Sequence, residues 1–178
     1  MKHLIGLWLL AAAILSAAAP KLIVPGSLTA HFVHTASGNG IIERNSGEVT
    51  VNRSRAFVAD LSRPSRQKVC NYRSDVQWID YGSRTVVRYR VGSLLDLMQI
   101  YKVARHYRGS YYKSNYHGYH FLLHVNGKGQ VDQLSFRDKR GAKNTIRLSR
   151  IRYDDRPQPA SKFRCKVPAS FRIYRGKI

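Results

Sequence analysis

Three histidines lie close together in the second half of the chain, at a spacing that could hold a metal ion. They are His117, His120 and His124, and imidazole is a common ligand of transition metals. The residues around them alternate between apolar and polar, which predicts a β-strand whose side chains point alternately to its two faces. His120 and His124 would share one face and His117 would point to the other. We therefore expect these histidines on the solvated face of a hairpin, with no metal site.

A run of tyrosines and cations precedes these histidines. Rings and cations in this mixture can stack on bases and neutralise phosphates of single-stranded nucleic acid. The alternative is a connection whose rings pack on the rim of the fold, and an N-terminal export signal makes nucleic acid an unexpected partner. The residues concerned are Tyr107, Arg108, Tyr111, Tyr112, Lys113, Tyr116 and Tyr119.

Cys70 and Cys165 are the only cysteines of the chain, and no CxxC spacing points to a zinc site. A disulfide between them would close a loop of about a hundred residues and stabilise the fold by about 4 kcal/mol in the chain-entropy model. Two reduced cysteines would instead act as small buried hydrophobic side chains. Spacing alone does not decide between these states, and both stay open.

Motifs typical of enzymes are missing from the sequence. The chain has no HExxH, GxSxG, P-loop or GxGxxG pattern, and its 10 Asp and Glu residues stand mostly at predicted turns. We expect neither enzymatic activity nor a cofactor. A secreted hydrolase is an alternative for which no convergent nucleophile and base is visible.

The charge and the N-terminus indicate an exported, strongly basic protein. The 178 residues carry 31 Lys and Arg against 10 Asp and Glu, a net charge of +21, which favours contact with anionic surfaces. Lys2 precedes an apolar run over positions 4–15 and then small residues, as in a secretory signal peptide. The run is shorter than the roughly 20 residues of a membrane-spanning helix. We expect cleavage after Ala18 or Ala19 and one domain over 19–178; an uncleaved anchor is the alternative.

Alternation of apolar residues with period two dominates the rest of the chain. Val49 and Val51 alternate out of a turn expected at 45–47. Roughly ten such stretches, each ended by turn residues, predict a mainly β (α+β) fold, a strongly curved antiparallel sheet or incomplete barrel. A phase slip between 146–148 and 151–153 predicts a β-bulge. The other expected strands are 28–34, 76–78, 87–91, 119–125, 131–136, 145–153, 162–167 and 171–174.

One segment has helical spacing instead. We expect an amphipathic helix over 93–106, with Ser93 as N-cap and with Arg105 and His106 near its end. Its apolar stripe must pack on the sheet, because nothing else can bury it. The stripe consists of Leu94, Leu95, Leu97, Met98, Tyr101 and Val103.

Several segments, in this order, resemble those of one known family. The opening strand 28–34 is similar to the family's first strand, and 47–57 is similar to its Gly-x-Leu-x-Val-Lys-Arg-Pro-x-x-Phe motif. The segment 63–69 resembles its x-Pro-x-x-x-x-Val strand, and 162–168 its terminal Lys-Phe-x-Phe-x-x-Pro. The family is LolA, the periplasmic carrier of outer-membrane lipoproteins, and the resemblance runs from Leu28 to Tyr174.

The resemblance implies an incomplete barrel with a helical lid over an apolar cavity. That cavity would take the acyl chains of triacylated or diacylated lipoproteins released by an inner-membrane LolCDE-type ABC transporter. The carrier, a periplasmic monomer, would pass them to an outer-membrane acceptor of LolB type or another kind. By position, Arg53 matches the arginine that latches the lid, and Phe57 matches a cavity aromatic near the entrance. The alternative is a secreted protein that binds free lipid or glycolipid in the same cavity.

The cavity lining is expected from the inner face of the curved sheet and the apolar stripe of the helix. These residues are Phe32, Val49, Val51, Phe57, Trp78, Tyr89, Leu94, Leu97, Met98, Tyr101, Phe121, Leu123, Phe136 and Ile146.

Overall fold

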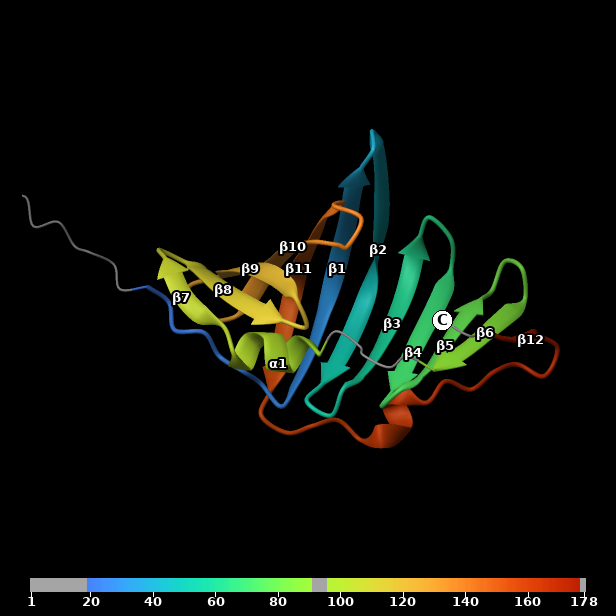
Figure 1. Ribbon diagram of the computed structural model, residues 1–178. Helices are drawn as coiled ribbons and strands as arrows, with labels where there is room; N and C mark the ends of the chain where they lie inside the picture. The colour runs from blue at the N-terminus through green and yellow to red at the C-terminus, as the bar shows by residue number, and fades with distance from the viewer. Residues whose placement is uncertain (1–18, 91–95, 177–178) are drawn as a thin grey trace, which may run out of the picture.

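The computed structural model describes residues 19–90 and 96–176, and Figure 1 shows one open, curled sheet with a short helix against it. The expected signal peptide lies outside the described residues. The strands are β1 (Ser27–Gly38), β2 (Ile41–Asn52), β3 (Ala56–Arg63), β4 (Gln67–Tyr72), β5 (Asp75–Asp80), β6 (Thr85–Arg90), β7 (Arg105–Arg108), β8 (Tyr111–Tyr116), β9 (Tyr119–Val125), β10 (Val131–Arg137), β11 (Lys143–Asp154) and β12 (Arg172–Arg175). The helices are α1 (Leu97–Lys102) and the 3-10 helix η1 (Ala160–Phe163).

The strand order explains how the sheet is built from hairpins. It runs β12-β6-β5-β4-β3-β2-β1-β11-β10-β9-β8-β7. Two antiparallel meanders, β2–β6 and β7–β11, therefore flank β1, which pairs with β2 on one side and β11 on the other. Only β12 among the described strands runs parallel to its neighbour, β6. The mainly β prediction is confirmed, with 12 strands instead of about ten and a helix shorter than expected. No helix among residues 19–90 and 96–176 could cross a membrane.

The sheet has two faces of different composition, since directly paired residues point to the same side. On the face we call inner, Leu28 pairs with Val51 and Tyr153, and Val51 pairs with Phe57. The helix α1 packs on this face. We call the opposite face outer.

Each face buries its own cluster. The larger cluster lies on the inner face and includes Leu28, Met98, Phe121 and Leu123, each at most 2% exposed. The smaller cluster lies on the outer face, where Phe163 of η1 packs with Ala56, Val58 and Cys70. Cys70 is joined to Cys165 by a disulfide whose Cα atoms lie 5.8 Å apart. The C-terminal segment is thus fixed to the back of β3 and β4.

The helix predicted over 93–106 has different ends in the structure. Its N-cap is Asp96, whose carboxylate accepts hydrogen bonds from the backbone of Met98 and Gln99; the proposed cap Ser93 lies outside the described residues. The helix ends at Lys102, and Arg105 and His106 belong to β7. Pairing of β7 with β8, with His106 opposite Tyr112, takes these residues into the sheet.

Two further expectations about strands are wrong, and one is confirmed. Residues 45–47 form no turn but the middle of β2, where a Cβ at Gly47 would collide with the carbonyl oxygen of Asp60. The strand expected at 162–167 is replaced by the end of η1 and an irregular segment, because Phe163 turns into the outer cluster. The bulge in β11 is confirmed by the register shift opposite Thr29 and His31.

Candidate functional site

The inner face divides into two halves that differ in how they are covered. The closed half consists of the inner sides of β1 and β8–β11 and the end of β2 at Val51, together with α1. The open half is defined by Phe57, Val69, Trp78, Val87 and Tyr89, which register places side by side on β3–β6. No described helix packs over the open half, because α1 makes its main contacts with β8.

The closed half is a packed core. Tyr101 and Met98 of α1 are 1% and 2% exposed, and Phe121 and Leu123 below them are equally buried. The rings of Phe121 and Phe136 lie 5.2 Å apart between centroids. Burial raises the pKa of Tyr101 well above 10.0. The expected lining residues that the structure brings together here are Val51, Leu97, Met98, Tyr101, Phe121, Leu123, Phe136 and Ile146.

The open half keeps large apolar side chains in contact with solvent. Trp78 is 39% exposed and Val87 is 36% exposed, while Phe57 and Tyr89 are half-buried. Burial raises the pKa of the Tyr89 hydroxyl above 10.0. None of these five side chains is charged, and their only polar groups are the Trp78 indole N–H and the Tyr89 hydroxyl, so the surface is mostly apolar. Such a surface suits a hydrocarbon ligand.

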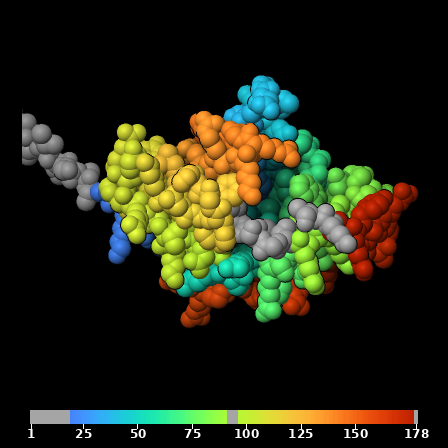
Figure 2. All heavy atoms as spheres, in the orientation of Figure 1, coloured from blue at the N-terminus to red at the C-terminus, as the bar shows by residue number. Residues whose placement is uncertain are grey.

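A hollow lies where the two halves meet. Figure 2 shows it between the β10–β11 hairpin and β3, with β1 and β2 at its floor. Phe32 of β1 and Val49 of β2 are half-buried residues of these floor strands and point to the inner face. The expected lining residue Leu94 lies outside the described residues. The structure therefore contains an apolar inner face, of which one half is packed and the other is open to solvent.

An arginine that sequence reasoning missed contacts the start of α1 from the β2–β3 turn. Arg55, in the β2–β3 turn with a φ of 56°, places its Nε 3.5 Å from Oδ2 of Asp96. The Asp96 side chain is 3% exposed and that of Arg55 is 64% exposed. The other oxygen of Asp96 accepts from the backbone nitrogens of Met98 and Gln99 at 3.1 and 3.2 Å. One carboxylate thus caps α1 and ties it to the turn.

The predicted latch, Arg53, lies elsewhere. It is exposed, and its guanidinium donates to the carbonyl oxygen of Val24, at 3.4 Å, in the segment before β1. The useful signal in the sequence was Asp96 itself, since an Asp before a helical apolar stripe favours an N-cap.

The histidines and tyrosines take separate roles. His124 contacts Asp132 at 2.6 Å, His120 contacts Asn115 at 2.7 Å, and His117 occupies a turn with a φ of 49°. The part of the chain that the structure describes contains no group of three His, Cys, Asp or Glu able to hold a metal. The tyrosine-rich run forms the β7–β8 hairpin, where the Lys113 ammonium lies 3.4 Å from the centre of the Tyr107 ring.

Comparisons with known proteins support the fold. Neither a family model nor a curated protein matches this sequence. Among solved structures, an uncharacterized conserved protein from Thermus thermophilus is similar, with a TM-score of 0.53 and 10% identity over 86% of this chain and 92% of that one. A LolA superfamily protein from Nitrosomonas europaea matches with a TM-score of 0.44 and 9% identity over 81% of this chain and 92% of that one. The Thermus protein shows a shared fold, and LolA superfamily proteins are among the structures that this chain resembles.

Proposed function

We propose that this protein is a periplasmic carrier whose inner face binds the acyl chains of lipoproteins. The observation that carries the proposal is the open half: an uncharged apolar surface on a curled sheet, with Trp78 and Val87 more than a third exposed. Soluble proteins bury such surfaces unless a ligand or partner covers them. Transfer of a CH₂ group from water to an apolar site is worth about 0.8 kcal/mol. Several acyl chain carbons on this face would therefore supply the binding energy.

The closed half supports the open half in this proposal. The packed cluster under α1 fixes the edge of the hollow, and the Arg55–Asp96 contact fixes the start of α1 beside it. A cargo chain that entered between the halves would meet α1 at its capped end. The lid-latch role predicted for Arg53 moves in this proposal to Arg55, because Arg55 is the arginine that contacts the helix.

The partners follow from the same proposal. Cargo would be triacylated or diacylated lipoprotein, received from a LolCDE-type transporter and passed to an outer-membrane acceptor. No covalent step is needed, since release depends only on a better apolar site in the acceptor. The net charge of +21 favours docking on acidic surfaces of those partners or on anionic headgroups.

Identification of the molecule bound after export tests this function. The protein is purified without detergent from the periplasm of its own host, and the retained material is identified by mass spectrometry. Acylated protein is the expected ligand. Free diacyl lipid or glycolipid alone would favour a lipid-binding protein over a lipoprotein carrier, and an empty protein would contradict both.

Matched variants locate the site in the same experiment. Phe57→Glu places a charge in the open half and is expected to reduce retained cargo by about tenfold, because a buried carboxylate without a partner is strongly unfavourable. Ile173→Glu is the control, since Ile173 is 49% exposed and lies on the outer face. Equal cargo in both variants would move the site away from the open half. Arg55→Leu and Arg53→Leu, compared for transfer to acceptor membranes, separate the two latch candidates.

A further inference from the structure

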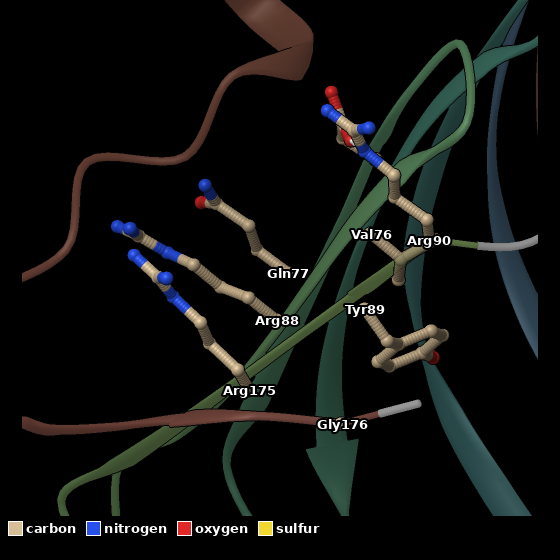
Figure 3. A pocket seen from close by; sticks show the side chains of 8 residues that line it. Val76, Gln77, Arg88, Tyr89, Arg90, Arg175 and Gly176 are labelled. Carbon is tan, nitrogen blue, oxygen red and sulfur yellow. Dashed lines mark hydrogen bonds and ion pairs between the residues drawn. The ribbon is translucent and has the colours of Figure 1, made fainter. Parts of the chain in front are cut away.

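Three polar side chains form a row across the last strands of the sheet. On the outer face, Gln77 of β5 is the register partner of Arg88 in β6, and Arg88 is the partner of Arg175 in β12. Directly paired side chains start about 5 Å apart at their Cβ atoms. Figure 3 shows the amide of Gln77 and the two guanidinium groups extending side by side, in the same direction, away from β6. The row therefore gathers donors at one place.

The charges of this row have no ion-pair partner in the part of the chain that the structure describes. The adjacent Arg90 has a partner, since its Nε lies 3.0 Å from Oδ1 of Asp75. Arg88 and Arg175 form no ion pair with any carboxylate among residues 19–90 and 96–176. Like charges at directly paired positions destabilise a sheet. Arg88 is half-buried and Arg175 is exposed, so solvent screens part of their repulsion, and an anion between them would relieve the rest.

Hydrogen bonding at the row is also incomplete. Nε of Arg88 and Oε1 of Gln77 are buried, and neither has a hydrogen-bond partner. A buried polar atom without a partner is unfavourable in a folded protein. Here two such atoms occur on neighbouring side chains that line one cavity, of about 690 Å³. A ligand in that cavity could bond both atoms once the two side chains turn toward it.

The donor set indicates the chemistry of the ligand. Guanidinium groups bind oxyanions through paired N–H donors, and the Gln77 amide adds an N–H donor. A carboxylate has two oxygens for these three side chains, whereas a phosphate group has three or four. A singly protonated phosphate also carries an O–H that Oε1 of Gln77 can accept. We propose that Gln77, Arg88 and Arg175 form a binding site for a phosphate group, either free phosphate or the phosphomonoester headgroup of a lipid.

Titration calorimetry of the mature protein at low ionic strength tests this site with two probes. One is inorganic phosphate, and the other is dihexanoyl phosphatidic acid below its micelle concentration. Binding of both with similar affinity assigns the site to free phosphate. Binding of the lipid at least about tenfold tighter, with the difference lost in Arg88→Gln, assigns it to a headgroup. Failure of both probes to bind at 10 mM, on the order of the weakest specific affinities, would overturn the proposal.

Substitutions connect the binding to the row. Arg88→Gln and Arg175→Gln are each expected to weaken binding by about tenfold, since each removes a charged donor. Arg44→Gln is the charge-matched control, because Arg44 is exposed in β2 away from the row, and less than a twofold change is expected on screening grounds. Equal effects of all three variants would show charge attraction without a site and overturn the proposal.

Thermal unfolding in different salts gives a second test of the site. Phosphate and sulfate should raise the melting temperature of the unaltered protein more than chloride at equal ionic strength, because only the folded protein offers the row. The part of the excess that comes from the site should be lost in Arg88→Gln, whereas the general salting-out effect of both anions remains. An equal excess in the unaltered protein and in Arg88→Gln would contradict the site independently of the lipid-carrier function.

Discussion

The two halves of the inner face use the same kinds of residue for different purposes. In the closed half, Phe121 and Leu123 are 2% and 0% exposed beneath α1, whereas Trp78 in the open half is 39% exposed. Both halves alternate apolar and polar residues with period two. What differs is cover: α1, a helix of six residues, buries its own half, and no helix of the described residues packs over the other half. An apolar pattern thus predicts that a face is buried, but it does not predict whether a helix, a ligand or a partner covers it.

The strands of the open half are packed on their outer face. Phe163 of η1 is 1% exposed against the outer sides of β3 and β4, and the Cys70–Cys165 disulfide fastens the chain beside it. A face can stay available for a ligand and still be rigid when its back is packed. Packing on the outer face therefore stabilises β3 and β4, since strands with no packed face are only marginally stable in water.

The largest expected contrast comes from truncating one aromatic in each half. Phe121→Ala should lower the free energy of unfolding by about 3–5 kcal/mol, because it leaves a cavity in a packed core. Trp78→Ala should cost about 1 kcal/mol, because much of that side chain is already in solvent. Urea unfolding followed by circular dichroism measures both. Similar costs would remove the distinction between the halves.

Breaking the disulfide tests the support behind the open half. Cys70→Ser with Cys165→Ser is expected to reduce stability by about 4 kcal/mol, the loop-closure term for a long loop. Phe163→Ala, with the disulfide intact, separates side-chain packing from the covalent link. The prediction is contradicted if reduction of the unaltered protein leaves its unfolding midpoint unchanged.

Alkaline pH should weaken the closed half selectively. Burial raises the pKa of Tyr153 to about 12 from 10.0. The folded protein therefore holds this proton more tightly than the unfolded chain. The resulting stability, about 2–3 kcal/mol, is complete below pH 10 and is lost as the pH rises towards 12. Tyr153→Phe should flatten the stability profile in that window, and Tyr174→Phe, at an exposed position, should not.

The smallest effects are expected at the border between the halves. Asp96→Ala should cost about 1–2 kcal/mol, because it removes the N-cap of α1. Asp96→Asn should cost less, since Asn also caps helices. Arg55→Gln should cost less than about 1 kcal/mol, because its guanidinium is mostly exposed. A double-mutant cycle in thermal unfolding measures the Arg55–Asp96 coupling, and zero coupling would argue against the tie.

Local patterns predicted most hairpins and the bulge, because strand period and turn residues act over a few positions. The end of α1 was not predictable in this way: Val103 continues the helical spacing, yet pairing of β7 with β8 removes the following residues from the helix. Gly47 follows Asn45 and Ser46 like a turn residue, but it is required where Asp60 approaches β2. In both cases the local conformation depends on a strand that is distant in the sequence, and the local sequence does not show which strand that is.

The candidate site was also predictable only in part. Membership of the inner face followed from alternation, whereas the division into packed and open halves depends on where a six-residue helix lies. Arg53 and Arg55 stand two positions apart in one basic turn, and only the backbone path selects Arg55 for Asp96. The cysteine pairing likewise rests on a Cα separation of 5.8 Å that spacing cannot give.

The central claim, that acyl chains bind on the open half, can be tested through the fluorescence of Trp78. The chain has two tryptophans, and in protein beginning at residue 19 Trp78 alone remains. Titration with a lipoprotein or fatty acid brominated along its chain should quench Trp78 saturably. The variant Trp78→Phe with Ile173→Trp, which moves the indole to the outer face, should show little quenching. Equal quenching at both positions, or none at Trp78, would contradict the account.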